Sequence, residues 1–426
     1  MPIYKNTSVS GIVRGVKAFL GQESGLTRND EIWNKSSEQK HNRTRKKLEE
    51  TQQRLARVRQ KLANKNDKLA ELQELVAELE AASSQQQVSR KDTSIFFVVG
   101  RPKSGTSWVR LGLDRHPEIL CKGEGEFFGS EYGSGQPQLG RPLDDIRPPS
   151  YRSLYTALAR SDLLRSWIEN SVWRHGCDTE EHIANLTHEA IYYFLTQRLA
   201  QSKLSQSKKR IVGDKTPFAS PEIIKEISTI CPEAKVIHII RDGRDVAVSQ
   251  LHHMWNHATT EEGEEGGWYL MASEELVKRD RYLKDPQEFL SSGESIFTEE
   301  RLREAAEGWR SDVGAAHRDG PVLLGENYTE VRYEIMLEKP EEEFEQLFRF
   351  LGAQADEDVV ARCVRAARFE KRSGGRERGQ EDPQAFARKG IAGDWKNVFT
   401  EQDKAIFKEA AGDLLIELGY EENQDW

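Results

Sequence analysis

The chain has 426 residues, enough for one large α/β domain and an additional segment. Its formal net charge of −9 excludes a general nucleic-acid binder, so any anion site must be a local cluster of basic groups. The four cysteines form no CxxC pair, which predicts free thiols in a reducing, cytoplasmic setting, and no apolar run approaches the roughly 20 residues that span a bilayer.

The N-terminal part of the chain divides into a tail, a helix and a linker. Residues 1–39 have no core-like pattern, although one short apolar stripe suits an amphipathic helix. Within residues 40–82, five apolar residues recur every seven positions: Leu48, Leu55, Leu62, Leu69 and Val76. This heptad predicts a coiled coil and therefore a homo-oligomer, because a lone helix would leave these side chains in water. A single helix folded back on the rest of the chain is the alternative. We interpret residues 83–92 as a linker.

Residues 93–426 alternate between strand and helix patterns. The buried-strand runs are IFFVV (95–99) and VIHII (236–240), with weaker strand signals at 210–213, 322–328 and 331–334. Amphipathic helical patterns cover 186–204 and 341–353. The alternation predicts an α/β fold with a parallel sheet flanked by helices, in which ligands bind at the carboxyl ends of the strands.

Three segments of this region lack a clear period. Residues 129–150 are rich in Gly and Pro, residues 258–296 contain the run EEGEE, and residues 371–386 contain several glycines and charges. We expect the first two to be surface insertions or lids that set specificity, and the third to be a mobile loop.

The first chemical motif follows IFFVV and reads GRPKSGTSW (100–108). A strand, a glycine-bounded loop and a helix start make an anion site, because backbone N–H groups and the helix dipole favour negative charge. The glycine spacing fits the nucleotide triphosphatase loop, but Thr106 occupies its lysine position and Lys103 stands inside the loop instead. The loop suits a phosphate, yet it lacks the lysine that spans the β- and γ-phosphates, which disfavours an ATPase.

The second motif is VIHIIRDGRDVAVSQ (236–250). It places Arg241 at a strand end and Ser249 on the helix that follows, so that both face one spot. The planar guanidinium and the hydroxyl are suitable donors for a phosphate, and Arg244 is a further candidate. Taken alone, RDGRD could also be a solvated turn.

Together the two runs resemble motifs of the sulfotransferases that use 3'-phosphoadenylyl sulfate (PAPS) as donor. The resemblance implies that Lys103 contacts the bridging oxygen and the leaving phosphate of the donor. It assigns the 5'-phosphate to Ser104, Gly105, Thr106 and Ser107, and it counts Arg101 among the donor-binding residues. It also places Trp108 near the adenine, and Arg241 and Ser249 at the 3'-phosphate.

Two further runs strengthen the resemblance, which covers residues 94–421. RKGIAGDWKN (388–397) is similar to a C-terminal run of this family. It implies that Arg388, Lys389 and Gly390 also hold the 3'-phosphate. Tyr333, in a Tyr-Glu pair, fits a family position near the adenine.

The acceptor hydroxyl must lose a proton, so a general base is expected. Glu124, in the run EGEFF, resembles the glutamate base of the carbohydrate enzymes of this family, with Phe127 and Phe128 shielding it. Glu126 is the alternative, and both glutamates could instead be loop charges. Lys215 is expected either to stabilise charge that develops on the sulfuryl group or to form a structural salt bridge.

No metal is predicted, because His252, His253 and His257 lack an evident further ligand. His116 is expected to be a structural hydrogen-bonding residue. The glutamate base favours a carbohydrate or glycoconjugate hydroxyl as acceptor. Two other functions stay open: a kinase or nucleotide hydrolase built on the same loop, which would need magnesium, and a catalytically idle coiled-coil scaffold.

Overall fold

The structure is a computed structural model that divides into two compact units, residues 1–81 and 82–426, which are described separately. It describes the following residues: 52, 55, 59, 62, 65, 93–129, 153–171, 178–203, 209–217, 221–259 and 269–426. The five separate positions are helical and exposed. The rest of the predicted coiled coil, the tail 1–39 and the linker 83–92 lie outside the described residues. None of the described helices is both long and apolar enough to cross a membrane.

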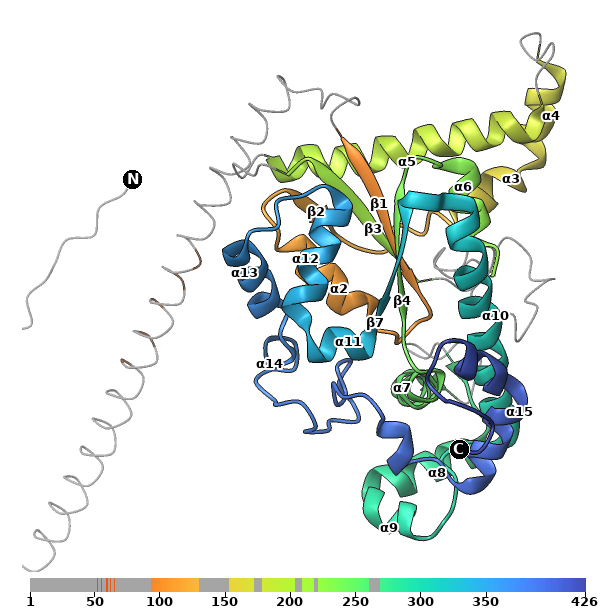
Figure 1. Cartoon of the computed structure of the whole chain (residues 1–426), viewed down its shortest axis with the longest axis vertical. Helices are drawn as coiled ribbons and strands as arrows, with labels where there is room; N and C mark the ends of the chain where they lie inside the picture. Colours follow the sequence, from red (N-terminus) through yellow and green to blue (C-terminus); the bar gives the residue numbers. More distant parts are fainter. Residues whose placement is uncertain are drawn as a thin grey trace, which may run out of the picture. The chain divides into compact units, whose positions relative to one another are not determined.

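The second unit contains a parallel sheet and many helices (Figure 1). The strands are β1 (Ser94–Gly100), β2 (Ile119–Cys121), β3 (Ile211–Pro217), β4 (Lys235–Ile240), β5 (Ala258–Thr259), β6 (Tyr269–Leu270) and β7 (Tyr328–Arg332). The helices are α2 (Thr106–Asp114), α3 (Leu154–Ala159), α4 (Asp162–Asn170), α5 (Thr179–Lys203), α6 (Ile223–Ile230), α7 (Gly243–Asn256), α8 (Ser273–Lys284), α9 (Pro286–Ser291), α10 (Glu299–Leu324), α11 (Tyr333–Glu338), α12 (Pro340–Leu351), α13 (Glu357–Ala367), α14 (Phe369–Arg372) and α15 (Glu401–Glu417). Two short 3-10 helices are η3 (Gly325–Asn327) and η4 (Asp394–Asn397).

The sheet has the order β2-β3-β1-β4-β7, and every pair in it is parallel. β1 lies at the centre, and its last residue, Gly100, is in register with Pro217 at the end of β3. Val99 is in register with His238 of β4, two residues before that strand ends. The segments that follow β1, β3 and β4 therefore leave the same edge of the sheet. This arrangement confirms the predicted α/β fold and brings the sequence motifs together.

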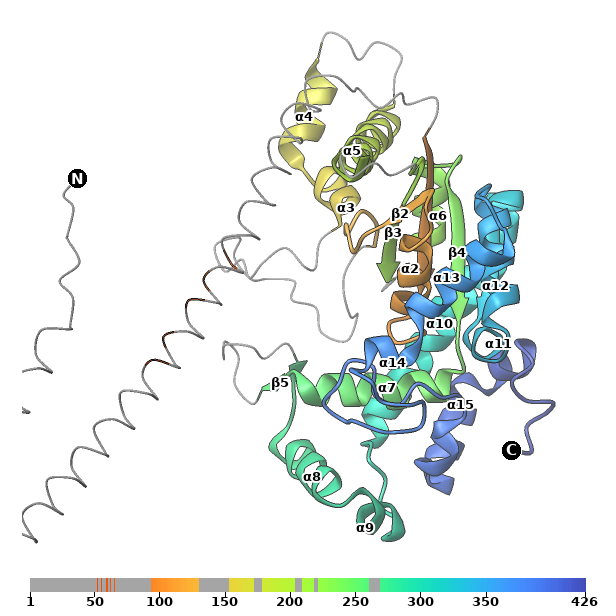
Figure 2. The same ribbon diagram turned by 90° about the vertical axis from the view of Figure 1, so that its left-hand side faces the viewer.

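Helices cover both faces of the sheet (Figures 1 and 2). Phe96 and Val98 of β1 pack with α2, α12 and α13, whereas Phe97 and Val99 pack with α5 and α6. The period of two along a strand explains this division, since successive side chains point to opposite faces. A third apolar cluster joins α7, α8, α9, α10 and α15 beyond the end of the sheet.

Two sequence predictions are wrong. Residues 322–328 do not form a strand: α10 continues to Leu324, η3 follows, and β7 begins only at Tyr328. The segment 258–296 is not simply an insertion, because α8 and α9 bury Tyr282 and Phe289 in the core. Residues 260–268 lie outside the described part, as do residues 130–150 of the other predicted insertion.

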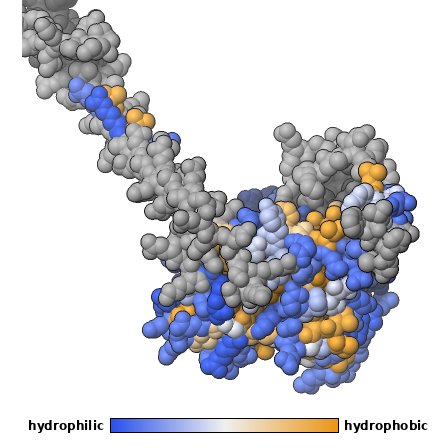
Figure 3. Space-filling model, turned by 90° about the horizontal axis from the view of Figure 1, so that it is seen from above, coloured by the Kyte–Doolittle hydropathy of each residue, from blue (hydrophilic) through white to orange (hydrophobic). Residues whose placement is uncertain are grey.

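The surface carries several exposed apolar side chains. Those on α4 and α5 are Leu163, Trp167, Leu186, Tyr193 and Phe194. The face seen from above shows apolar patches among mostly hydrophilic residues (Figure 3).

Candidate active site

The phosphate loop joins β1 to α2 as the sequence predicts. Gly100 ends the strand and Thr106 begins the helix, whose first N–H groups lack partners within the helix. Lys103 and Gly105 have φ angles of 77° and 101°, in the left-handed region. The hydroxyl of Ser104 is fully buried and has no hydrogen-bond partner. A buried polar atom without a partner is costly, so this hydroxyl marks a place for a ligand oxygen.

Lys103 lies among positive charges. Burial lowers its pKa to about 8, with further contributions from four neighbouring cations: Arg241, Lys215, Arg372 and Arg388. Its ammonium lies 4.3 Å from the centre of the Phe386 ring and pairs with no carboxylate in the described part of the chain. A buried lysine that lacks a carboxylate partner and lies close to other cations suits an anionic ligand.

Arg241 connects the phosphate loop to the C-terminal loop, which we define as residues 388–395. Its Nη1 donates to the carbonyl oxygen of Lys103 (3.0 Å) and its Nη2 to that of Ile391 (3.1 Å). The guanidinium also lies 4.4 Å from the centre of the Tyr333 ring. Its buried Nε has no hydrogen-bond partner. Arg241 therefore fixes two loops and retains one donor for a ligand.

The C-terminal loop carries two further cations. Arg388 forms ion pairs with Glu381 and Asp394, while its buried Nε has no hydrogen-bond partner. Lys389 donates to Asp394 (2.7 Å). Gly390 has a φ of 70°, and a Cβ at this position would lie 2.4 Å from the ring of Phe369. A larger residue would therefore displace this part of the loop.

Asp245 attaches the C-terminal loop to α7. Its carboxylate accepts hydrogen bonds from the backbone N–H groups of Gly393 (2.7 Å) and Trp395 (3.0 Å), and it lies 3.6 Å from Arg241. Ser249 is partly buried one turn further along the helix. Two motifs that are about 150 residues apart are thus held at one place.

Trp108 and Tyr333 form a buried aromatic pair beside the phosphate loop. Their ring centres are 5.7 Å apart in an edge-to-face arrangement. A Cβ on Gly105 would lie 2.6 Å from the Tyr333 ring, so only glycine fits beside this ring without displacement. Arg101 is held differently: its guanidinium pairs with Asp312 of α10.

Lys215 and Glu124 form an ion pair at the end of β3. The ammonium of Lys215 also lies 3.5 Å from the hydroxyl of Ser107 on α2. Lys215 is buried, whereas the Glu124 side chain is 49% exposed. The two residues therefore connect the phosphate loop to the segment that carries the candidate base.

Asp214 holds in place the segment that carries Glu124. Its buried carboxylate accepts hydrogen bonds from the backbone of Gly125 (2.9 Å) and from Arg198 of α5 (2.7 Å). Burial raises the pKa of Asp214 to about 6. Lys215 N–H donates to the carbonyl oxygen of Gly123 (3.0 Å), so the backbone also pairs with β3 here.

The expected shielding of Glu124 is not found. Phe127 and Phe128 are buried in the core, where Phe128 packs edge-to-face against Phe97, and Glu124 stays about half exposed. Glu126 has a φ of 50°, and its pKa is raised by partial burial and by the nearby charges of Glu124 and Asp214.

Comparison with known proteins identifies the family of this chain. Residues 93–419 match the family described as "sulfotransferase domain". The chain belongs to the sulfotransferase domain family. The match confirms the predicted PAPS-dependent sulfotransferase.

Solved sulfotransferases are also similar to this one. Mouse sulfotransferase SULT7A1 complexed with PAP has 16% identity, covers 78% of this chain and 87% of its own, and gives a TM-score of 0.37. The sulfotransferase domain of the curacin biosynthetic pathway has 15% identity, covers 76% and 97%, and also scores 0.37. The domain of the Synechococcus olefin synthase has 16% identity, covers 76% and 96%, and scores 0.36. The family assignment rests on the sequence match.

The histidines of the sulfotransferase differ in their surroundings. His116 is buried and bonded on both ring nitrogens, by the backbone N–H of Glu118 (3.1 Å) and to the carbonyl oxygen of Gln354 (2.7 Å), which confirms its structural role. His252 is buried without hydrogen-bond partners, and burial lowers its pKa to about 3. Among the described residues, no group of three or more His, Cys, Asp or Glu side chains is placed to hold a metal ion.

Arg244 is not an open phosphate donor. Its side chain is almost fully buried, and it forms ion pairs with Asp242 and Glu421. Its guanidinium lies 3.7 Å from the centre of the Trp395 ring and 4.4 Å from that of Trp426. The sequence pattern RDGRD gave no sign of these distant partners.

Two residues near the donor site were missed by the sequence analysis. The positive charge of Arg372, on α14, helps to lower the pKa of Lys103, and burial lowers the pKa of Arg372 itself. Phe386 is 64% exposed and stacks with the Lys103 ammonium. Both lie in the glycine-rich segment 371–386, whose lack of periodicity concealed them.

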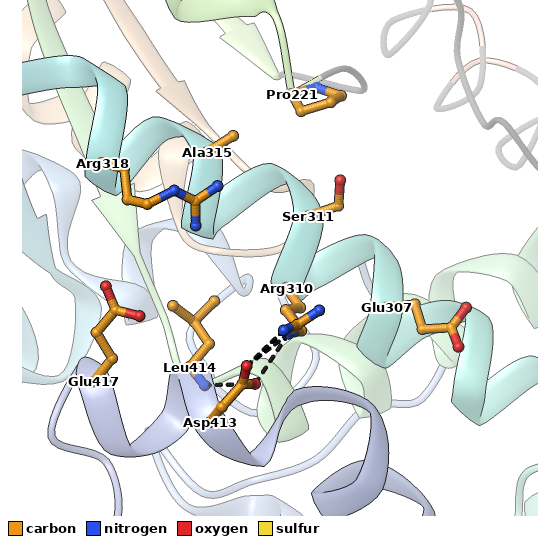
Figure 4. Close-up of a pocket in the computed structure, with 9 residues that line it drawn as sticks. All are labelled: Pro221, Glu307, Arg310, Ser311, Ala315, Arg318, Asp413, Leu414 and Glu417. Carbon is orange, nitrogen blue, oxygen red and sulfur yellow. Dashed lines mark hydrogen bonds and ion pairs between the residues drawn. The ribbon is translucent and has the colours of Figure 1, made fainter.

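A separate pocket lies between α10 and α15 of the sulfotransferase (Figure 4). Arg310 and Asp413 pair across it with a shortest distance of 2.6 Å. None of the donor-site residues lines this pocket.

Proposed function

We propose that this sulfotransferase passes a sulfuryl group from PAPS to a hydroxyl group of a carbohydrate or glycoconjugate. The observation that supports the donor site most strongly is the set of buried donors without partners: Ser104 Oγ, Arg241 Nε and Arg388 Nε. These atoms are carried by the phosphate loop, the segment after β4 and the C-terminal loop. A nucleotide with phosphates at both ends of its ribose has the acceptor oxygens that they lack.

The residues fit this donor in two groups. We assign the 5'-phosphate to Arg101, Ser104, Gly105, Thr106 and Ser107, where the loop meets the helix N-terminus. We assign the 3'-phosphate to Arg241, Ser249, Arg388, Lys389 and Gly390. Trp108 and Tyr333 form the aromatic pair that we assign to the adenine.

PAPS, when bound, supplies a sulfuryl group on a phosphate leaving group. Lys103 is assigned to neutralise the negative charge that develops on the leaving oxygen, a role that favours the transition state over the ground state. Lys215 contacts both Ser107 and Glu124. We assign it to position the donor relative to the base and to stabilise charge on the sulfuryl oxygens.

Glu124 is our candidate for the residue that takes the proton of the acceptor hydroxyl. Its carboxylate is half exposed and therefore accessible to an acceptor, and its ion-pair partner Lys215 reaches the phosphate loop. Glu126 is the alternative, because its raised pKa makes it a stronger base. The glutamate base favours a carbohydrate acceptor.

The experiment that tests the function uses the full chain with sulfur-labelled PAPS and a panel of hydroxyl compounds that includes glycans and small phenols. Label transferred to a glycan, absent with Lys103→Ala, is the expected result. Label transferred only to phenols would contradict the acceptor class. Hydrolysis of ATP with magnesium, and no labelled product from PAPS, would instead favour a nucleotide hydrolase.

We also propose that residues 40–82 join copies of the chain. Leu55 and Leu62 are 51% and 59% exposed in the single chain, and a partner helix would cover them. Light scattering of the wild type and of a Leu55→Glu, Leu62→Glu variant measures the assembly directly. A wild-type monomer would contradict it.

We propose a cytoplasmic location. Cys121, Cys231 and Cys363 are buried and free of disulfides, as suits a reducing compartment. Fractionation of cells that express the protein tests this directly.

A further inference from the structure

The segment after Arg241 is held by the last residues of the chain, which we call the closing segment (420–426). Arg241 is followed by a turn in which Asp242 caps α7. The Asp242 carboxylate accepts a hydrogen bond from the backbone N–H of Arg244 (2.9 Å). The same carboxylate binds the Arg244 guanidinium through Nε (3.0 Å) and Nη2 (2.8 Å). The position of this turn, and so the direction of Arg241, depends on where Arg244 lies.

Arg244 is fixed by aromatic rings and an acid from distant parts of the sequence. Trp395 and Trp426 are set at 80° to each other with ring centres 5.8 Å apart, and they form a corner around the guanidinium. Glu421 pairs with the remaining nitrogen of Arg244. Aromatic rings contact the faces of this buried guanidinium, and carboxylates pair with its nitrogens, so it is held in one position.

A second connection reaches the same turn through Glu334. The backbone N–H of Asp242 donates to one oxygen of Glu334 (3.0 Å), and the hydroxyl of Tyr420 donates to the other (3.0 Å). Tyr420 belongs to the closing segment. The turn is therefore tied to that segment through both the side chain and the backbone of Asp242.

Trp395, which packs against Trp426, also belongs to the C-terminal loop. Its backbone N–H donates to Asp245, which lies beside Arg241. One aromatic corner thus supports both sides of the site that we assign to the 3'-phosphate. Lys408 of α15 contacts the Trp426 ring as well, with 5.0 Å between its ammonium and the ring centre.

We infer that the closing segment, acting through Trp426 and Glu421 on Arg244, sets the affinity of the enzyme for the 3'-phosphate of its donor. Trp426 and Glu421 are positioning residues in this arrangement, because they touch Arg244. This inference rests on the proposed function, in which Arg241 binds the 3'-phosphate.

The test compares the binding of adenosine 3',5'-bisphosphate and adenosine 5'-phosphate to the full chain by calorimetry. Trp426→Ala is expected to reduce the preference for the bisphosphate roughly tenfold, since contacting residues couple with energies of this size. Trp426→Phe, which keeps an aromatic face, is expected to restore most of it. At saturating PAPS, kcat is expected to stay near the wild-type value while KM for PAPS rises.

A second pair of variants keeps the test informative if Trp426→Ala does not fold. Glu421→Gln removes the charge that pairs with Arg244, and Glu422→Gln makes the same change at the exposed neighbouring position. Of these two variants, only Glu421→Gln is expected to weaken the preference for the bisphosphate. Unchanged preference in folded Trp426→Ala or in Glu421→Gln would overturn the inference. A wild type that binds both nucleotides equally would instead overturn the proposed function.

Discussion

Lys215 and Glu124 form an ion pair whose lysine also lies 3.5 Å from the Ser107 hydroxyl. One buried ammonium thus connects the helix of the phosphate loop to the carboxylate proposed as the base. Any acceptor that reaches Glu124 therefore also approaches the donor loop. The first prediction follows from this relationship.

Glu124→Gln is expected to lower kcat by about 10²–10⁴, because a positioned base contributes a factor of this size. Glu126→Gln serves as its control and is expected to keep most of the activity. The pH profile gives an independent check. Since the pKa of Glu126 is raised, a rising limb above the ordinary carboxylate range, with loss of activity in Glu126→Gln, would identify Glu126 as the base instead.

Lys103→Ala is expected to reduce kcat by at least about 10²-fold while donor affinity changes little, because the assigned charge develops only in the transition state. Steady-state kinetics together with nucleotide binding measure the two effects separately. Lys339→Ala changes an exposed lysine on the same domain and is the control. Turnover similar to the wild type would refute the assigned role.

The pKa of Lys103 predicts how kcat/KM depends on pH. The ammonium is charged below about pH 8 and loses its proton above it, so the charge that neutralises the leaving oxygen is present below this value. The value of kcat/KM is expected to fall by about tenfold for each pH unit above 8, until the activity of the neutral form is reached. Lys103→Arg keeps its charge throughout this range, and its profile is expected to be flat above pH 8. An equally flat wild-type profile would show that Lys103 does not act through its charge.

Arg241→Ala is expected to weaken adenosine 3',5'-bisphosphate binding by about 100-fold and to leave adenosine 5'-phosphate binding almost unchanged, because only the first carries the 3'-phosphate. Arg310→Ala, which removes an arginine of the separate pocket, is the matched control. A mutant that still distinguishes the two nucleotides would mean that the 3'-phosphate lies elsewhere.

Gly105→Ala is expected to destabilise the protein by about 1–3 kcal/mol and to weaken donor binding, since its φ is 101° and a Cβ would lie 2.6 Å from the Tyr333 ring. Gly293 also has a positive φ, 75°, but nothing lies within 4 Å of an added Cβ. Gly293→Ala therefore isolates the backbone cost. Urea unfolding of the two variants is the measurement, and equal losses would exclude the steric contribution.

Much of the fold could be predicted because the central strands are continuous apolar runs. β1 and β4 are buried on both faces, and only His238 interrupts their apolar runs. The strand prediction for residues 322–328 was wrong for the opposite reason. Val322 and Leu323 suggested a strand, yet they are 82% and 44% exposed at the end of α10. A hydrophobic run indicates burial only when the fold provides a surface to cover it.

The site residues that belong to short local motifs could be predicted from the sequence. The glycines, Lys103 and Arg241 occur within short runs whose spacing reflects a strand, a loop and a helix. The environment of Arg244 could not be predicted, because Trp395 and Trp426 lie more than 150 positions further along the chain. Likewise, only the folded chain shows that Phe127 and Phe128 are buried in the core.

The cations that surround Lys103 are concentrated in a chain with a net charge of −9. Such a field guides a small, multiply charged anion by steered diffusion, while the net negative charge of the chain repels long polyanions. The association rate of the donor is accordingly expected to decline as ionic strength rises, because salt shortens the reach of the attraction. Selection for the nucleotide therefore begins in solution, ahead of any direct contact.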